Sequence, residues 1–442
     1  MANKWDIIGK LPPMLSGEEL KRKLEIFPLY DISVRSKSRS ERLMALNDIY
    51  NIYLPSVMSE EIYSKIYLAM LRSLQKKEGK LAVQQRNENG RRIRNTGSPD
   101  YGYRGIIGGS DSFTIIGNSG IGKSSAISRA ISIATEDRVL EMEEPFCKII
   151  PMLVVQCPFD CSVKGLLFQI LRQIDMELDT HYYDMAVGAR ATTDMLIGSV
   201  SQIALNHIGM LIVDEIQNIV NHRHGKSLVG MLTQLINNSG ISICMVGTPE
   251  AETFFESVDY LSRRALGLRY KSCGYNTYFR EFCTALFQYQ YVQEESVISD
   301  SIIQWLYEHS AGVLAVVVGI THDAQEISIL NGRERLDMIS LNDAYEQRMN
   351  MMHVHIKPSV VIKRDAIKKK KGNIADMIGD NRQEENEEGA DGADSNVVVI
   401  FSADKEDARD WTFMELAGQA KKDQCDIVDL LKGRISITEI TV

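Results

Sequence analysis

The octapeptide at residues 117–124 constrains the fold more than any other stretch of this chain. It reads Gly-Asn-Ser-Gly-Ile-Gly-Lys-Ser, which is the pattern G-x-x-x-x-G-K-S. The apolar run Phe113–Ile116 precedes it, and a helical pattern starts at Ser125. A strand, a glycine-rich turn and a helix form the context in which this pattern binds nucleotide phosphates. A chance match is a weak alternative, because the flanking segments fit as well.

Each part of the octapeptide has a chemical role in binding phosphate. Glycines let the backbone curl so that its N–H groups point at phosphate oxygens, and the positive end of the following helix adds to the attraction. The Lys123 ammonium can reach the β- and γ-phosphates, and the Ser124 hydroxyl can bind Mg²⁺. We therefore expect ATP and Mg²⁺ at this loop, bound by Gly117, Asn118, Ser119, Gly120, Ile121, Gly122, Lys123, Ser124 and Ser125.

Two carboxylates follow a second apolar run. Asp214 and Glu215 come directly after Met210–Val213. Asp214 would hold Mg²⁺ through water, and Glu215 would orient and deprotonate the attacking water, which requires hydrogen-bond reach. Phosphoryl transfer needs mainly positioning and charge neutralisation, and these residue types supply both. The pair predicts an ATPase with Asp214 at the metal and Glu215 as the catalytic base.

Two further polar positions fit an ATPase. Thr248 follows the apolar run 241–246 and is expected beside the γ-phosphate, although a Thr-Pro pair can also simply end a strand. Arg263 and Arg264 are candidates for an arginine that stabilises the transferring phosphate of a neighbouring subunit's ATP. From spacing alone, an ordinary surface pair of arginines is nearly as good an interpretation.

Composition and patterning bound the class of protein. The chain has 442 residues, of which 44% are hydrophobic and 25% charged, and its net charge is −9. That length predicts two or three domains, and that charge argues against a generally basic nucleic-acid binder. The seven cysteines are scattered and odd in number, which favours reduced thiols. We expect a cytosolic protein that has no membrane association, since no signal-peptide pattern or membrane-length apolar run is present.

Strand and helix patterns alternate over residues 105–270. The apolar runs are nearly continuous, and amphipathic helical patterns lie between them. This alternation predicts a parallel sheet covered by helices on both faces. Helical patterns return over residues 276–355, where the run Val313–Ile320 fits either a buried helix or a strand.

Taken together, these stretches resemble the TnsC/TniB family of AAA+ transposition regulators of Tn-seven-like transposons, CRISPR-associated ones among them. Asp-Glu-Ile-Gln at 214–217 and Gly-Thr-Pro-Glu-Ala at 247–251 carry the resemblance more specifically than the phosphate loop, and Arg263-Arg264 adds to it. The stretches Phe27–Tyr30 and Ser40–Arg42 also resemble the longer TnsC members. The resemblance covers about residues 20–355.

The resemblance implies a function. Such proteins bind and hydrolyse ATP, assemble as a homo-oligomeric ring or filament around duplex DNA, and disassemble on hydrolysis. They link a target selector (TnsD/TniQ-like) to transposase subunits (TnsA/TnsB-like). By position, Thr248 would sense the γ-phosphate and Arg263 or Arg264 would act across the subunit interface. Lys164 and Arg190 are the candidates for DNA contact, although both also fit solvated surface residues.

The resemblance also organises the chain. It implies an AAA+ α/β fold with a helical lid. The switch from the basic run 368–371 to the acidic run 384–391 separately predicts a disordered C-terminal tether. We expect a helical N-terminal region for partner docking (1–80), a polar linker (81–104), the nucleotide-binding domain (105–275), the lid (276–357), a charged disordered tether (358–395) and a partner-binding tail (396–442). A very small independent module is the competing interpretation of the tail.

One departure and two rival functions remain. The lid stretch 310–316 offers no arginine at the position usual for nucleotide sensing, which bears on the rate of hydrolysis rather than on ATP binding. One rival is a nucleotide-controlled signalling or defence ATPase without DNA binding. The other is a helicase-loader-like ATPase. A nuclease or integrase is disfavoured, because no acidic triad stands apart from Asp214 and Glu215.

Overall fold

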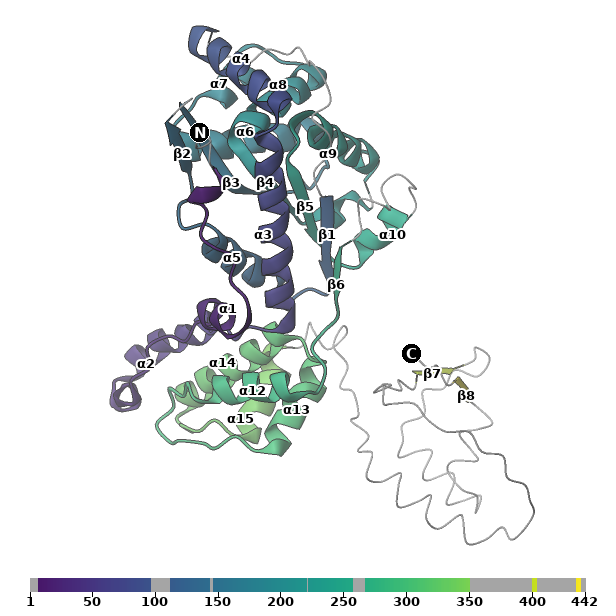
Figure 1. Cartoon of the computed structure of the whole chain (residues 1–442). Coiled ribbons are helices and arrows are strands. Elements are labelled where there is room, and N and C mark those ends of the chain that lie inside the picture. The colour runs from purple at the N-terminus through teal and green to yellow at the C-terminus, as the bar shows by residue number, and fades with distance from the viewer. Residues whose placement is uncertain are drawn as a thin grey trace, which may run out of the picture. The chain divides into compact units, whose positions relative to one another are not determined.

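A six-stranded sheet, in which five strands run parallel, lies at the centre of the main unit of the computed structural model (Figure 1). The structure describes residues 7–96, 112–143, 146–220, 222–256, 267–349, 400–403 and 435–438. The chain divides into two units, Met1–Ile362 and Lys363–Val442. The predicted tether and the pair Arg263-Arg264 lie outside the described residues.

The strand order is β2-β3-β4-β5-β1-β6. The pair β2–β3 is antiparallel, and all other neighbours are parallel. Ligands of such sheets bind beyond the carboxyl ends of the strands, where the order switches. Here β5 lies between β4 and β1 and pairs parallel with both, so the loops after β1, β4 and β5 meet at one edge. The bounds are β1 Ser112–Gly117, β2 Leu140–Glu143, β3 Phe146–Gln156, β4 Ile208–Asp214, β5 Ser242–Gly247 and β6 Leu268–Tyr270.

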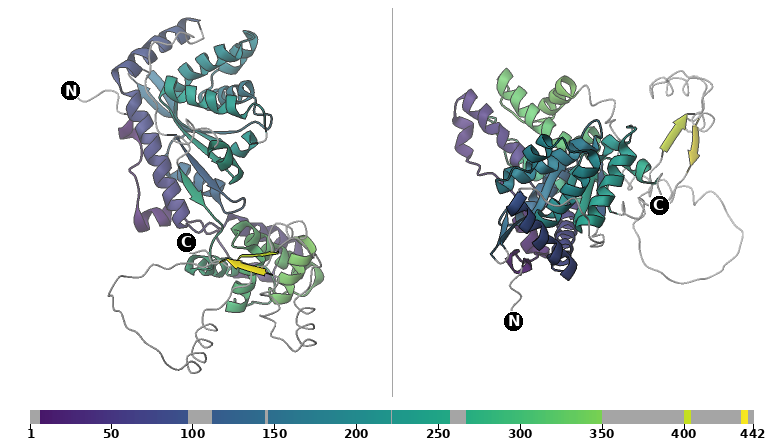
Figure 2. Two further views of the ribbon diagram at one scale, coloured as in Figure 1. Left: turned by 90° about the vertical axis from the view of Figure 1, so that its right-hand side faces the viewer. Right: turned by 90° about the horizontal axis from the view of Figure 1, so that it is seen from above.

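Both faces of the sheet are covered by helices, as the alternation predicted (Figures 1 and 2). In β1, Ile115 packs into one hydrophobic cluster and Ile116 into the other, because successive side chains of a strand point to opposite faces. One face carries α3 (Val57–Lys77) and α5 (Lys123–Ala134). The other face carries α6 (Val163–Leu178), α8 (Thr193–His207) and α9 (Gly225–Ser239).

The prediction of a polar linker at 81–104 is wrong for its first part. Residues Lys80–Thr96 form the helix α4, which packs on α8. Two of its buried side chains are amides: Asn89 Nδ2 donates to Gln202 Oε1 at 2.7 Å and Gln85 Nε2 to the same oxygen at 3.3 Å. Hydrogen-bonded amides can be buried without an apolar stripe, so hydrophobic periodicity does not reveal this helix.

The N-terminal region is divided between two cores. The long helix α3, capped by Ser56, packs against the sheet together with α1 (Gly17–Leu24). Residues 34–52, which include α2 (Arg39–Ala45), pack instead into the hydrophobic cluster of the lid. The buried Arg42 fixes this attachment: it donates to Glu334 Oε1 at 2.7 Å and to the Tyr291 carbonyl at 3.0 Å.

Helices form the lid, as the sequence predicted. The run Val313–Ile320, which periodicity left open, belongs to a buried helix. The lid helices are α12 (Thr277–Phe287), α13 (Asp300–Ser310), α14 (Leu314–Asn331) and α15 (Met338–Arg348). No single helix among the described residues is long and apolar enough to cross a membrane; α13 and α14 pass that test only when joined across a 119° bend.

The second unit is described at two strands. The strands β7 (Ile400–Ala403) and β8 (Ile435–Thr438) pair antiparallel, with Phe401 opposite Ile437. Both lie in the stretch 396–442, for which a tail and a small module were the two expectations. Partner binding by this stretch stays a prediction.

Candidate nucleotide-binding site

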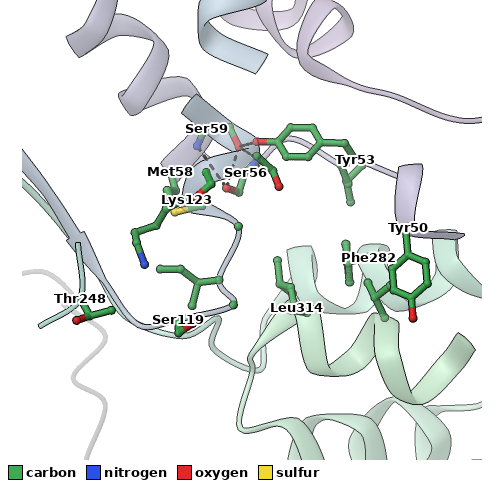
Figure 3. Close-up of a pocket in the computed structure, with 18 of the residues that line it drawn as sticks. Tyr50, Tyr53, Ser56, Met58, Ser59, Ser119, Lys123, Thr248, Phe282 and Leu314 are labelled. Carbon is green, nitrogen blue, oxygen red and sulfur yellow. Dashed lines mark hydrogen bonds between the residues drawn. The ribbon is translucent and has the colours of Figure 1, made fainter. Parts of the chain in front are cut away.

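The three predicted motifs converge on one cavity of about 430 Å³ at the carboxyl edge of the sheet. The phosphate loop from Ser119 to Ser125 forms its floor. Asp214, Glu215 and Thr248 line it from the ends of β4 and β5. Figure 3 shows Lys123 and Thr248 on one side of this cavity, with Tyr50 and Phe282 on the other.

The phosphate loop needs glycine at two positions. Gly120 and Gly122 have φ angles of 77° and 96°, which side chains rarely tolerate. A Cβ on Gly120 would also lie 2.9 Å from Val313 Cγ1. The loop is therefore tightly curled and in close contact with the lid.

Lys123 begins α5 and turns its ammonium back into the loop. Nζ donates to the Gly117 carbonyl at 2.6 Å and to the Asn118 carbonyl at 2.8 Å, and the residue is only 9% exposed. Burial lowers the pKa of Lys123, while the charges of Asp214 and Glu215 oppose that shift. A positive charge is thus held where the motif predicts the phosphates.

The ends of β4 and β5 are joined by hydrogen bonds. Glu215 has a left-handed backbone (φ 57°), and its N–H donates to Asp214 Oδ1 at 2.8 Å. Gln217 Nε2 donates to Glu215 Oε2, and Gln217 Oε1 accepts from the Thr248 N–H at 3.3 Å. The carboxylate of Glu215 is therefore held in place by a neighbouring amide.

Oxygen ligands suited to Mg²⁺ are present. The Ser124 hydroxyl and the Asp214 carboxylate line the same cavity, and hard oxygen donors are what Mg²⁺ takes. The donor set therefore fits the predicted metal.

Sequence reasoning missed the opposite wall of the cavity. It is formed by the N-terminal segment and the lid, with Tyr53 O–H and Ser59 Oγ hydrogen-bonded at 2.7 Å and the Tyr278 hydroxyl donating to the Leu54 carbonyl at 2.9 Å. Apolar and aromatic walls with a few polar groups suit a nucleobase. The residues of this wall come from separate segments with no shared motif, so no local sequence signal marks them. They are Tyr50, Ile52, Tyr53, Leu54, Ser56, Met58, Ser59, Tyr278, Phe282, Leu314, Ala315 and Val318.

The lid touches the phosphate loop through backbone rather than through an arginine. The Ala315 N–H, in the first turn of α14, donates to the Gly120 carbonyl at 3.0 Å. No arginine lines the cavity among the described residues. The stretch 310–316, which has no arginine, thus contacts the phosphate loop directly through the backbone of α14.

The predicted DNA-contacting residues are neighbours at the surface. Lys164, at the start of α6, is exposed and its Nζ donates to the Ala191 carbonyl at 3.2 Å. Arg190, which directly precedes Ala191, is exposed and has a left-handed backbone (φ 48°). The fold therefore brings together two cations that are distant in sequence.

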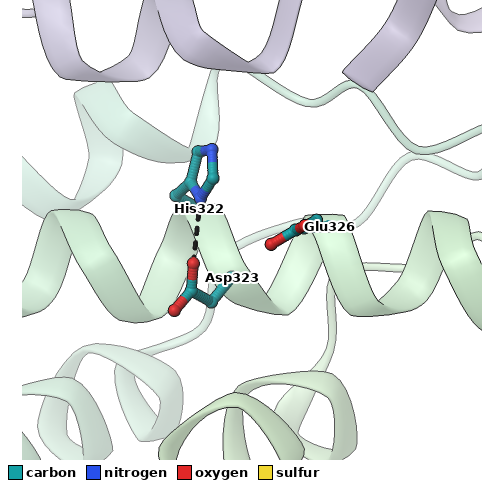
Figure 4. Close-up of side chains that lie close together, drawn as sticks. All are labelled: His322, Asp323 and Glu326. Carbon is teal, nitrogen blue, oxygen red and sulfur yellow. Dashed lines mark hydrogen bonds and ion pairs between the residues drawn. The ribbon is translucent and has the colours of Figure 1, made fainter. Parts of the chain in front are cut away.

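A second group of potential ligands lies on the lid helix α14 (Figure 4). His322 Nδ1 lies 3.0 Å from Asp323 Oδ1, and Glu326 is nearby. The Arg348 guanidinium lies 3.6 Å from Glu326, and the His322 ring packs at 4.8 Å on Tyr50. These contacts account for the cluster as part of the packing between the N-terminal segment and the lid.

The strand order, phosphate loop and helical lid define an AAA+ P-loop ATPase fold. Residues 109–269 match the model of the bacterial TniB protein family, a family of transposition-associated AAA+ ATPases. The resemblance seen in the sequence motifs is thus confirmed over the nucleotide-binding domain. A search of curated proteins gave no match.

Similar solved structures are distant. The Aeropyrum pernix ORC1 protein in complex with DNA is 13% identical, with a TM-score of 0.39, and the match covers 60% of this chain and 64% of that one. The Aeropyrum pernix ORC2 protein (ADPNP-ADP complexes) is 15% identical, with a TM-score of 0.35 and coverage of 60% and 66%. Drosophila ORC bound to DNA is 13% identical, with a TM-score of 0.42 and coverage of 84% and 90%. The chain thus spans slightly less than two thirds of the first two.

Proposed function

We propose that this protein is an ATP-hydrolysing regulator of DNA transposition. One observation carries the proposal: Lys123, Ser124, Asp214, Glu215 and Thr248 line a single cavity in a segment that matches the TniB family. The protein would assemble on duplex DNA as a homo-oligomeric ring or filament. It would connect a TnsD/TniQ-like target selector to TnsA/TnsB-like transposase subunits, and ATP hydrolysis would release the assembly.

The residues of the cavity have distinct roles in this proposal. Lys123 exchanges its two carbonyl partners for the β- and γ-phosphates. Ser124 and Asp214 hold Mg²⁺, which neutralises phosphate charge when bound. Glu215 takes the proton of the attacking water, and Thr248 contacts the γ-phosphate. These roles need no rearrangement of the strands, because all five residues already lie at one edge of the sheet.

The mixed wall opposite the phosphate loop would take the nucleoside. Tyr53, Tyr278 and Phe282 offer aromatic surface, and the hydroxyls of Ser56 and Ser59 offer hydrogen-bonding groups. Because this wall combines the N-terminal segment with the lid, bound nucleotide would bridge both to the sheet. A change from ATP to ADP would therefore alter contacts of the N-terminal segment and of the lid as well as of the sheet.

Assembly and DNA contact rest on residues away from the cavity. Arg263 or Arg264 would complete a neighbouring subunit's site, and Lys164 and Arg190 would contact phosphates of duplex DNA. Backbone contacts of this kind position a protein without reading sequence. We accordingly propose recognition of DNA shape and charge.

Electron microscopy tests this function. The protein is imaged with a slowly hydrolysed ATP analogue, with and without duplex DNA at low salt, beside Lys123→Ala. Rings or filaments that require both nucleotide and duplex, and that are lost in Lys123→Ala, are the expected result. Nucleotide-dependent oligomers indifferent to DNA would support the signalling ATPase instead, and a preference for single strands would support the helicase-loader alternative.

A further inference from the structure

We propose that Gln217 is a positioning residue that couples the γ-phosphate sensor to the catalytic base. This inference rests on the proposed ATPase function. Gln217 uses both ends of one carboxamide: its N–H group binds the Glu215 carboxylate and its oxygen accepts the Thr248 N–H at 3.3 Å. Its carboxamide therefore forms a hydrogen-bonded bridge between the residue that activates water and the loop that meets the γ-phosphate.

The backbone places Gln217 for this role. The left-handed turn at Glu215 starts a short 3-10 helix, Ile216–Ile219, at the carboxyl end of β4. That turn brings the side chains of Glu215 and Gln217 within hydrogen-bond reach of each other. The Glu215 N–H is held by Asp214 at 2.8 Å, so both the backbone and the carboxylate of Glu215 are fixed by neighbours.

The groove that holds the amide is tight. A Cβ on Gly247 would lie 2.8 Å from Gln217 Oε1 and 2.8 Å from Ile216 Cγ2. Only glycine therefore lets the end of β5 approach the carboxamide this closely. Movement of Thr248 toward or away from a γ-phosphate would pull on the same amide that orients Glu215.

The glutamine carboxamide satisfies both partners. A donor must face the Glu215 carboxylate and an acceptor must face the Thr248 N–H, and a primary amide supplies one at each end. Glutamate at this position would keep the acceptor but put a second negative charge beside Glu215. Alanine or leucine would remove both hydrogen bonds.

Steady-state ATPase assays of Gln217→Ala and Gln217→Glu test the inference. We expect kcat to fall roughly 10- to 100-fold in both, because small misplacements of a catalytic group cost that much, while KM and nucleotide affinity stay near wild type. Gln304→Ala is the matched control: it removes a Gln–Glu hydrogen bond of 2.9 Å on the lid surface, and its kcat should be unchanged. Melting temperatures of all variants identify any that fail to fold.

A double-mutant cycle separates positioning from general destabilisation. If Gln217 acts through Glu215, adding Gln217→Ala to Glu215→Ala lowers single-turnover hydrolysis no further, whereas a purely structural role lowers both backgrounds equally. Equal loss in both backgrounds, or a kcat of Gln217→Ala at or above wild type, would overturn the inference. If the wild-type protein hydrolyses no ATP, or if Lys123→Ala leaves its hydrolysis unchanged, the proposed ATPase function itself would be overturned.

Discussion

Lys123 is held by neutral partners that a nucleotide would replace with charged ones. Its ammonium binds two carbonyl oxygens of its own loop, and phosphate oxygens form stronger, charge-assisted hydrogen bonds than carbonyls do. The buried position also weakens competition from water. In the proposed function, we expect this residue to contribute more to ATP binding than an exposed lysine would.

We expect Lys123→Ala to weaken ATP binding roughly 100-fold, since hydrogen bonds to charged groups contribute about 1.5–3 kcal/mol. Equilibrium titration with a fluorescent ATP analogue measures this. Lys226→Ala, which removes an exposed lysine of α9, should bind normally. Equal affinities of wild type and Lys123→Ala would contradict the assigned phosphate contact.

A buried histidine makes stability depend on pH. Burial lowers the pKa of His207 to about 4; its ring contacts the Lys148 carbonyl at 2.8 Å and the Tyr182 hydroxyl at 3.0 Å. The unfolded chain takes up this proton near its usual pKa, before the folded chain does. Stability is therefore lost as pH falls from about 6.5 toward 4.

The free energy of unfolding should fall by about 3 kcal/mol between pH 6.5 and pH 4 because of this residue. Thermal unfolding at a series of pH values measures the fall. His207→Gln should show a shallower fall of melting temperature below pH 6.5 than wild type. Identical slopes for the two proteins would assign the pH dependence to other groups.

At the scale of elements, sequence patterns predicted the sheet and most of its covering helices, because those segments bury apolar side chains with regular spacing. The phosphate loop and the acidic strand end were likewise local motifs. The helix α4 was missed because three of its buried residues, Gln85, Arg86 and Asn89, are polar, and the small Ala82 beside them makes no apolar stripe. The aromatic wall of the cavity was missed because its residues meet only after the N-terminal segment has packed on the lid.

A buried ion pair between Arg42 and Glu334 contributes to that packing. Arg42 is 2% exposed, and its hydrogen bond lowers the pKa of Glu334. Removing one partner of a buried pair leaves the other uncompensated, so Arg42→Ala should destabilise the fold by about 3 kcal/mol. Because the folded pKa of Glu334 is depressed, this contribution is present above the unfolded pKa of a glutamate and is lost as pH falls through the folded value.

Thermal unfolding near neutral pH checks this. Arg333→Ala is the matched control: it breaks a more exposed pair with Asp337 and should cost less than about 1 kcal/mol. Similar melting temperatures for Arg42→Ala and Arg333→Ala would mean that the N-terminal segment is held to the lid chiefly by apolar contacts.

At the scale of the whole molecule, the net charge of −9 means that the proposed DNA binding would depend on local cations. If Lys164 and Arg190 contact phosphates, Lys164→Ala should weaken duplex binding at every sequence and reduce the slope of log affinity against log salt by about one. Titrations at several salt concentrations in the presence of an ATP analogue measure the slope. Arg335→Ala, at an exposed lid pair with Glu294, should leave it unchanged; an equal change would make the effect one of overall charge.

The division of the N-terminal region has a mechanical consequence. The chain crosses between sheet and lid near residues 25–33, 52–56 and 271–276, and the first two crossings are tied by paired backbone hydrogen bonds of 2.9 Å between Ile26 and Tyr53. A domain attached to its neighbour at two places rotates about the axis that joins the two attachments. Tyr53 and Tyr278, beside those attachments, both line the cavity. We therefore expect a lid movement driven from the cavity to be mainly a rotation about one axis near these attachments.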